Sequence, residues 1–444
     1  MKVFFITIIF LGFVSISLAE DIELYIGDTA SRVGSKPQVL IIFDNSGSMR
    51  TTEEVKTPYD PSISYGAVGG NSQLSQEFLY FTKGVSGDSA LVVDSLSETR
   101  RFVATINSCD VARERLANVG YYTGHLREYR FSGNAGSWQE IAGSQGETLK
   151  IVDCWDDISL ENNNNESVIL ADGSLSTLPD GYPVDGLGSE GNPSYYTDNV
   201  ASSNTNLGSG QVVTLYSANY LRWSQSNSIG LIDRTRLDIA KDTVTNLIES
   251  APSVDFGLQI FNLDYPNESY RNGGRVIFGI QEMTAAARSN LVNLIDLEIT
   301  AETNTPLCES LYEASRYFGG KSVQYGDDDS NYSNWYIGNT PPRDQTIENS
   351  SKVYQSPYTG CSNEVYVIMI TDGSPTQDRA ADGQIALLPN ISILSGNNYL
   401  SSLAQWMHTN DINESLEGDQ TSTLFTIGFS SGSTGAKPLL KEAA

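Results

Sequence analysis

The chain has 444 residues and a formal net charge of −27, from 54 Asp and Glu against 27 Lys and Arg. That length is sufficient for two or more domains, each with a core of its own. Because affinity for nucleic acid comes from clustered Lys and Arg, the charge excludes sequence-independent binding to nucleic acid as a main role, and it disfavours attraction to anionic lipid.

The first 19 residues have the pattern of a secretory signal peptide. Lys2 supplies the charged start, an apolar run covers 3–14, and Ser17-Leu18-Ala19 resembles a cleavage site. The alternative is an uncleaved membrane anchor, but the run is short for a bilayer span. We therefore expect cleavage before Glu20 and export to the periplasm, outer membrane or cell surface, with the mature chain at most peripheral to a membrane.

Four cysteines in an exported chain can pair in three ways. We favour Cys109–Cys154 and Cys308–Cys361, because each pair would brace one long irregular segment. A bridge across a loop this large contributes on the order of 4 kcal/mol in the chain-entropy model. The alternative is that the cysteines are free buried thiols.

The first predicted element is a buried strand at 39–43, where the apolar run is unbroken. From Arg50 to about Ile229 the sequence is irregular, with a short helix expected at 110–118 and a strand at 212–216.

Regular periodicity returns at Thr235, where a helix is predicted to begin. Further strands are predicted at 254–261, 275–281, 364–370 and 422–429, and further helices at 284–297, 306–318, 400–408 and from 437 onward. This alternation predicts an α/β fold, with a mostly parallel sheet, helices on both faces and large irregular insertions.

Three oxygen-bearing side chains follow the first strand in the pattern D-x-S-x-S: Asp44, Ser46 and Ser48. A carboxylate and two hydroxyls at alternate positions can converge on a hard cation such as Mg²⁺. Ligands of open α/β sheets also bind outside the carboxyl ends of the strands. The alternative is a hydroxyl-capped turn from strand to helix, since Asp and Ser are favoured N-cap residues.

Two later segments provide further candidate ligands. Thr305 precedes Pro306, which we expect at the first position of a helix, and the alternative role of Thr305 is an ordinary N-cap. Asp372 follows the 364–370 strand, and the alternative is a turn-forming Asp-Gly pair. Both positions are compatible with a cation site at the edge of the sheet.

Other chemistries find little support. Asp327, Asp329 and Asn331 have the spacing of an EF-hand loop, but Tyr332 stands where Gly is required and Gly338 where Glu is required. There are two histidines, no nucleophile elbow and no phosphate-binding glycine loop after a strand. We therefore expect a protein that is not an enzyme.

The three loops together resemble the metal-ion-dependent adhesion site of von Willebrand factor A domains. Over roughly 37–444 the chain also resembles the N-terminal part of the PilY family, the type IV pilus tip-associated adhesins and biogenesis factors. The resemblance is carried by Pro58-Tyr59-Asp60-Pro61-Ser62, Cys109-Asp110-Val111-Ala112, Gly120-Tyr121-Tyr122-Thr123-Gly124, Val152-Asp153-Cys154, Leu215-Tyr216-Ser217-Ala218-Asn219-Tyr220-Leu221-Arg222-Trp223, Thr305-Pro306-Leu307-Cys308-Glu309-Ser310-Leu311-Tyr312-Glu313 and Ser356-Pro357.

The resemblance implies a domain organisation. A lead segment at 20–36 would be followed by a von Willebrand factor A-like, Rossmann-like domain at 37–50 and 231–444. This domain would be interrupted by an inserted subdomain at 51–230 and a second insertion at 321–362. We expect it to be incomplete at its C-terminal end, because the helix that starts at 437 has no cap or terminating glycine. The resemblance also implies a missing C-terminal β-propeller with a calcium loop.

The resemblance also implies a binding site and its partners. The five adhesion-site positions are matched by Asp44, Ser46, Ser48, Thr305 and Asp372. They would hold a divalent cation, Mg²⁺ first, with Mn²⁺ or Ca²⁺ as alternatives. The partners would be minor pilins or other pilus tip components, and host or abiotic surface ligands that offer an acidic group.

The expected function is a metal-dependent adhesion module that acts in pilus assembly and surface attachment. Three alternatives remain at this stage. The metal could be purely structural in an assembly scaffold, the chain could be an exported metal-dependent hydrolase, or it could be a force-responsive element in which the disulfides limit extension.

Overall fold

A computed structural model describes most of the chain from residue 36 onward. The signal-peptide prediction, nearly all of the 20–36 segment, the loop from Asp327 to Gly338, and Cys361 lie outside the described residues. The described ranges are 36–66, 74–83, 98–132, 135–149, 151–154, 166–169, 175–178, 182–183, 196–197, 211–251, 254–262, 273–326, 341–358, 365–394 and 398–444.

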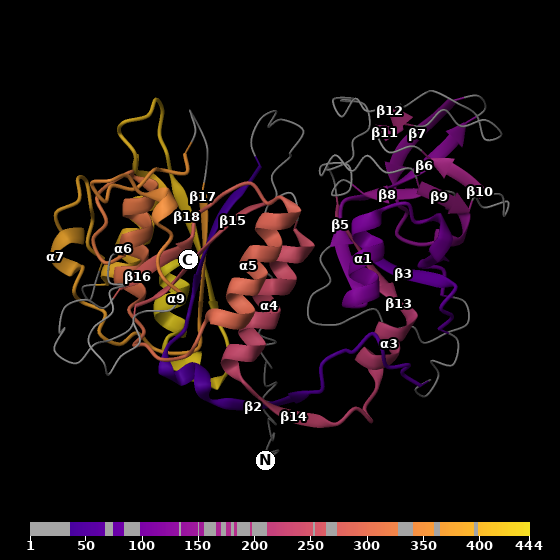
Figure 1. Cartoon of the computed structure of the whole chain (residues 1–444), viewed down its shortest axis with the longest axis horizontal. Helices are drawn as coiled ribbons and strands as arrows, with labels where there is room; N and C mark the ends of the chain where they lie inside the picture. The colour runs from indigo at the N-terminus through magenta and orange to yellow at the C-terminus, as the bar shows by residue number, and fades with distance from the viewer. Residues whose placement is uncertain are drawn as a thin grey trace, which may run out of the picture.

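A five-stranded sheet forms the centre of the α/β unit (Figure 1). Its order is β16-β15-β1-β17-β18, and every neighbouring pair is parallel except β15 with β16, which is antiparallel. The strands are β1 (Gln38–Phe43), β15 (Asp255–Phe261), β16 (Gly274–Phe278), β17 (Val365–Thr371) and β18 (Ser422–Gly428). The expected α/β class with a mostly parallel sheet is therefore confirmed.

The central strands β1 and β17 are buried on both faces because they are apolar along nearly their whole length. In β1, Leu40 and Ile42 join one core cluster, whereas Val39, Ile41 and Phe43 join the other. The second cluster is covered by α4 (Arg236–Ser250) and α5 (Ala285–Glu298), and the first by α6 (Leu307–Phe318), α8 (Tyr399–Thr409) and α9 (Lys437–Ala443). The short α7 (Asp382–Ile385) packs against α8, on the same face of the sheet.

Local chemistry explains where the helices begin. The Thr235 side chain accepts a hydrogen bond from the backbone N–H of Asp238, and the Thr284 side chain accepts one from Ala287, so both residues act as N-caps. The third helix differs slightly from the prediction. Pro306 is its N-cap residue and α6 starts at Leu307, so Thr305 lies one residue before the cap.

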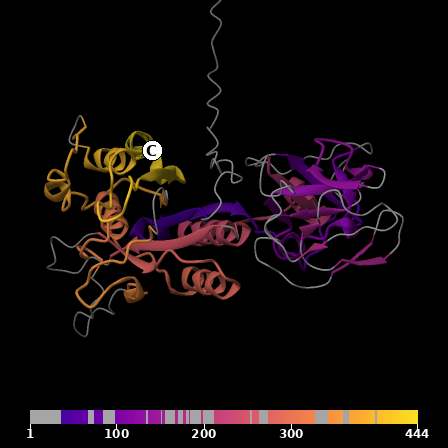
Figure 2. The same cartoon turned by 90° about the horizontal axis from the view of Figure 1, so that it is seen from above.

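A second unit lies beside the first and is joined to it by a two-stranded ribbon (Figures 1 and 2). The chain leaves the α/β unit along β2 (Thr52–Lys56) and returns along β14 (Leu231–Thr235), which pairs antiparallel with β2. We call β2 and β14 the ribbon, and the described residues between them the inserted lobe.

The inserted lobe is built on antiparallel strands. Its four-stranded sheet has the order β4-β3-β13-β5 and its three-stranded sheet the order β7-β6-β8. The elements are β3 (Phe78–Lys83), β4 (Arg101–Val103), α1 (Asp110–Asn118), β5 (Tyr121–Gly124), β6 (Leu126–Ser132), β7 (Ala135–Glu140), β8 (Val152–Cys154), β9 (Glu166–Ile169), β10 (Leu175–Leu178), β11 (Tyr182–Pro183), β12 (Tyr196–Thr197), β13 (Val213–Ser217) and α3 (Ala218–Gln225). The lobe also contains two short 3-10 helices, η3 (Ala104–Ile106) and η4 (Gly146–Thr148), and the α/β unit contains η2 (Gly47–Arg50), η5 (Gln345–Ile347) and η6 (Ser431–Gly435).

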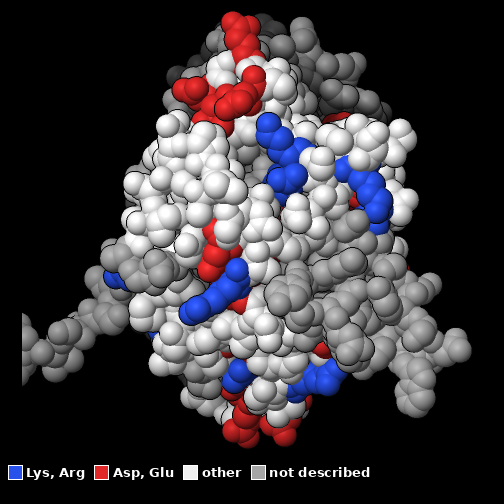
Figure 3. All heavy atoms as spheres, turned by 90° about the vertical axis from the view of Figure 1, so that its left-hand side faces the viewer, with Lys and Arg blue, Asp and Glu red and all other residues white. Residues whose placement is uncertain are grey.

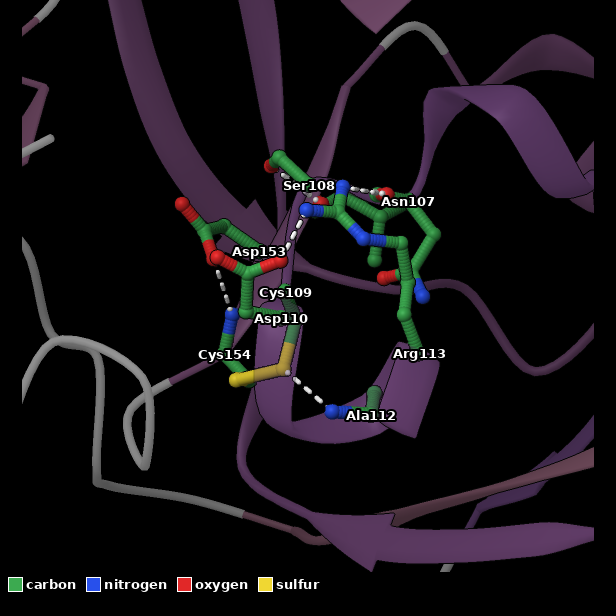
Figure 4. Close-up of a disulfide and its surroundings, with 9 residues drawn as sticks. Asn107, Ser108, Cys109, Asp110, Ala112, Arg113, Asp153 and Cys154 are labelled. Carbon is green, nitrogen blue, oxygen red and sulfur yellow. Dashed lines mark hydrogen bonds and ion pairs between the residues drawn. A yellow bond between two sulfur atoms is a disulfide. The ribbon is translucent and has the colours of Figure 1, made fainter. Parts of the chain in front are cut away.

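One disulfide staples the core of the inserted lobe (Figure 4). Cys109 is the N-cap residue of α1, its sulfur accepts a hydrogen bond from the backbone N–H of Ala112, and it is bonded to Cys154 in β8. The first predicted pairing is therefore confirmed. The second predicted pairing involves Cys361, which lies outside the described residues, so it stays a prediction. Its other member, Cys308, is a free thiol in this structure and is buried in the first turn of α6. Its side chain belongs to the apolar core under the sheet, which an even count of cysteines does not reveal.

Candidate metal centre

The predicted cation site lies where the strand order of the sheet reverses. Counted in chain order, the strands of the sheet run 3-2-1-4-5, because β15 and β16 lie on one side of β1 and β17 and β18 on the other. Loops at the carboxyl ends of the two central strands diverge at this point, which makes it the usual binding crevice of open α/β sheets. Asp44 directly follows β1 and Asp372 directly follows β17, so both occupy this crevice.

Asp44 is the most enclosed member of the site, with 0% of its surface exposed. Its Oδ1 accepts a hydrogen bond from the backbone N–H of Ser46 (2.7 Å), and its Oδ2 accepts one from the Thr371 hydroxyl (2.6 Å). Burial raises the pKa of Asp44 to about 6, and the charge of Asp372 adds to this rise, while the bonds from Ser46 and Thr371 oppose it. The neighbours therefore hold the carboxylate in place without neutralising it.

Ser46, Ser48 and Asp372 form a continuous chain of oxygens beside Asp44. The hydroxyls of Ser46 and Ser48 are 2.9 Å apart, and the Ser48 hydroxyl donates to Asp372 Oδ1 at 2.7 Å. Asp372 is fully buried whereas Ser48 is exposed, so the chain runs from the interior to the surface. The structure thus brings together four of the five predicted ligands.

Thr305 is brought to the same edge through its backbone. Its loop pairs with the Asp44 loop, where Ser46 forms a parallel bridge with Thr303 and the N–H of Gly47 donates to the Thr303 carbonyl (2.9 Å). The N–H of Thr305 donates to the Thr376 hydroxyl at 2.9 Å, and its carbonyl accepts from the N–H of Thr376 at 3.0 Å. Among the described residues, no hydrogen bond links the Thr305 hydroxyl to the other four side chains. Thr305 is buried in the loop next to them.

Arg236 is a site residue that the sequence reasoning missed. Its Nη1 donates to Asp372 Oδ2 at 2.8 Å, and its other nitrogens bind Glu53 Oε1 at 2.8 and 2.9 Å. Only 8% of the side chain is exposed. Arg236 is also the first residue of α4, where the helix dipole disfavours a cation. A basic residue at a helix start is thus the signal that could have pointed to a specific acidic partner.

Asn45, the variable residue of the D-x-S-x-S pattern, fixes the first loop to its neighbours. Its side chain accepts from the Phe261 N–H (2.8 Å) and donates to the Phe261 carbonyl (3.3 Å), which closes a pair of bonds to the end of β15. Its carbonyl accepts from the N–H of Glu302 at 2.9 Å. Asn45 therefore connects β1, β15 and the Thr303 loop, and it makes the Asp44 loop a rigid part of the sheet.

The donor set fits a hard divalent cation. Adjacent oxygens of an octahedral Mg²⁺ shell are about 2.9 Å apart, because Mg–O distances are about 2.0–2.1 Å. The Ser46–Ser48 and Ser48–Asp372 oxygen pairs have separations of 2.9 and 2.7 Å. Electrostatics agree with this fit, since Asp372 and Glu53 share one guanidinium, that of Arg236, while the buried carboxylate of Asp44 has only neutral hydrogen-bond donors, and buried charge requires compensation.

A different cluster in the inserted lobe is a poorer candidate. The ligand atoms of Cys109, Asp153 and Cys154 lie within 4.8 Å of one another. However, the two sulfurs are bonded to each other and cannot act as thiolate ligands. One Asp153 oxygen also accepts a hydrogen bond from the backbone N–H of Cys154 at 2.8 Å (Figure 4).

Comparison with known proteins is informative for the inserted lobe. A family model described as "Domain of unknown function (DUF8355)" matches residues 78–226, which run from the start of β3 to just past α3. No curated protein and no solved structure matches the chain. Residues 78–226 are therefore similar to this family, whose description states no function.

Two general properties complete the picture of the surface. In the described part of the chain, no helix is long and apolar enough to cross a membrane. On the face shown in Figure 3, acidic and basic side chains occur in small separate groups.

Proposed function

We propose that this chain is a metal-dependent binding module with a von Willebrand factor A-like site. The observation that carries the proposal is the convergence of Asp44, Ser46, Ser48 and Asp372 at the switch point of the sheet, from segments more than three hundred positions apart. Bound there, a Mg²⁺-type ion would supply an electrophilic position for an acidic group of a partner.

The roles of the side chains follow from their contacts. Ser46 and Ser48 would offer neutral hydroxyls, and Ser48 is exposed, so the ion would be accessible from the surface. Thr371 orients Asp44, and Arg236 orients Asp372. Thr305 would add its oxygen from the neighbouring loop. Neutral hydroxyls leave the ion short of negative charge, and a carboxylate from a partner would complete its shell.

The wider context is also a proposal. The resemblance to PilY proteins supports a role at the tip of a type IV pilus, in pilus assembly and surface attachment, with minor pilins or an acidic surface ligand as partners. The Cys109–Cys154 disulfide supports an exported chain, because disulfides persist in oxidising compartments.

The same contacts favour one second candidate, a pilus-assembly scaffold in which the cation is structural. The Ser48–Asp372 bond joins the loop after β1 to the loop after β17, so a cation here would also cross-link the sheet edge. Partner binding that survives removal of the metal, together with impaired folding, would select this candidate.

The proposal is tested by the thermal stability of the purified chain with Mg²⁺ and with a chelator. At a hundredfold excess over the dissociation constant, Mg²⁺ should stabilise the wild type by about 2.7 kcal/mol. Asp44→Ala should abolish this response. The matched control is Asp419→Ala, at an exposed acid of another loop, which should keep it. If Mg²⁺, Mn²⁺ and Ca²⁺ all left the thermal stability of the wild-type protein unchanged, the proposal would be overturned.

A further inference from the structure

Both strands of the ribbon end at the cation site. Ser48 lies in η2, directly before β2, and Arg236 directly follows β14. The N–H of Arg236 donates to the Thr51 carbonyl at 2.9 Å, which continues the ladder in which Thr235 pairs with Thr52. The ribbon therefore holds one ligand-bearing segment and Arg236 in a fixed relation.

Arg236 is shared between the ribbon and the site. Its guanidinium lies between Glu53 of β2 and Asp372 after β17. Gly432 packs tightly against this contact, because a Cβ at Gly432 would lie 2.5 Å from Arg236 Nη1 and 2.3 Å from the Asp372 carbonyl oxygen. A small displacement of the ribbon must therefore change the Arg236–Asp372 contact.

At its far end, the ribbon is attached to the inserted lobe. The Lys56 ammonium donates to the carbonyls of Trp223 (2.5 Å) and Ser224 (3.1 Å) in α3, and the Trp223 indole donates to the Thr57 carbonyl at 2.9 Å. These bonds tie β2 to α3, so a displacement of the lobe would be transmitted to β2.

Between the lobe and α4 lies a cleft of about 620 Å³, lined by Tyr121 and Trp223 on one side and Asp242 and Glu249 on the other. Beside the cleft, Arg115 of the lobe forms an ion pair with Glu249 and a 3.2 Å hydrogen bond with Asn246. The lobe therefore rests on α4 through polar contacts beside open volume. Such contacts resist displacement less than a continuous apolar interface does.

We infer that Arg236 is a resident counter-charge of the cation site, placed by the ribbon, so that the position of the inserted lobe sets the affinity for the cation. This inference rests on the proposed function and adds its regulation. While Arg236 is paired with Asp372, the guanidinium neutralises the charge of that carboxylate and repels an approaching cation. When the ribbon draws Arg236 away, Asp372 loses that compensation and the site binds the cation more tightly.

Two substitutions should shift the affinity in opposite directions. Arg236→Gln removes the repulsion, so the Mg²⁺ dissociation constant should fall roughly tenfold. Glu53→Gln removes a carboxylate that competes with Asp372 for Arg236, so the pairing of Arg236 with Asp372 strengthens and that constant should rise. Arg236→Lys, which keeps the charge, should stay near the wild type.

The matched control is Arg234→Gln, which removes the same positive charge as Arg236→Gln but from a residue of β14, two positions earlier. The Arg234 side chain binds Asp242 (2.6 Å) on α4 instead of the site, so its loss should leave Mg²⁺ affinity unchanged. Isothermal titration calorimetry measures all four variants. If Arg234→Gln and Arg236→Gln shifted the Mg²⁺ affinity equally, the effect would be one of net charge alone and the inference would be overturned. A folded Arg236→Gln protein with unchanged or weaker Mg²⁺ affinity would overturn it as well.

A second readout follows from reciprocity, because a lobe position that alters cation affinity must itself be altered by the cation. Mg²⁺ should change hydrogen exchange of the β2 and β14 amides in the wild type, and this change should disappear in Arg236→Gln. Exchange that is identical with and without Mg²⁺, in a wild type that binds the ion, would refute the coupling while leaving the proposed function intact. Failure of the wild type to bind any ion would refute both.

Discussion

Asp44 combines complete burial with a carboxylate whose bonding partners are all neutral groups. The Ser46 N–H and the Thr371 hydroxyl donate to its two oxygens, whereas the neighbouring Asp372 is paired with the guanidinium of Arg236. A buried carboxylate without a cationic partner is costly. The energetic deficit at this residue is what a bound cation would relieve.

The pH dependence of cation binding follows from this residue. The folded-state pKa of about 6 lies above the ordinary value of 3.8, so the cation-free protein prefers protonated Asp44 and loses stability as the pH rises from about 4 to about 6. A cation needs the ionised form and competes with the proton. We expect the Mg²⁺ dissociation constant to be about tenfold larger at pH 5 than at pH 7. Titration calorimetry at both values checks this, and equal constants would contradict it.

At the scale of elements, the strands that carry the site are predictable to within one residue. The sequence predicts strands at 39–43 and 364–370, and the structure has Gln38–Phe43 and Val365–Thr371. Both are doubly buried, so their apolar runs are continuous and end abruptly at Asp44 and at the turn containing Asp372. Because parallel strands end at one edge, the meeting of these two loops also follows from sequence.

Arg236 shows where such reasoning stops. Its partner Asp372 is 136 positions away, and the contact exists because β14 folds back along β2 and delivers the start of α4 to the sheet edge. No local pattern encodes that pairing, because the ribbon has no buried residue and its strands mix charged and apolar residues without a regular period. The same holds for Cys308, whose burial depends on how α6 packs.

The start of the second insertion is anchored by a single acid of α6. Glu313 is fully buried and accepts bonds from the N–H groups of Gln324 (3.1 Å) and Tyr325 (2.8 Å) and from the Tyr354 hydroxyl (2.6 Å). One helical carboxylate therefore ties both described parts of this segment to α6.

Glu313→Ala should lower the free energy of unfolding by about 3 kcal/mol, because it leaves several buried donors without an acceptor. Urea denaturation measures the loss. Tyr354→Phe removes one donor together with its bond and should cost about 1 kcal/mol. Equal costs for the two variants would show that the carboxylate does not organise the segment.

At the scale of the whole molecule, the two units have separate cores. The clusters around the five-stranded sheet contain no residue of the inserted lobe, and the cluster around Phe81, Cys109 and Cys154 contains none of the α/β unit. The ribbon and the Arg115 contacts join units that each bury their own apolar surface. Each unit should therefore unfold in a transition of its own.

The cysteines distinguish these transitions. The Cys109–Cys154 bridge spans 45 positions, and its removal by Cys109→Ser with Cys154→Ser should cost the lobe about 4 kcal/mol in the chain-entropy model. Scanning calorimetry should show one transition moving to lower temperature while the other stays. Cys308→Ser is the matched control, because it places a hydroxyl in the core under α6 and should move only the other transition. If either substitution moved both transitions together, the units would be one cooperative body, and a lobe that shifts on its ribbon to adjust the cation site would lose its structural basis.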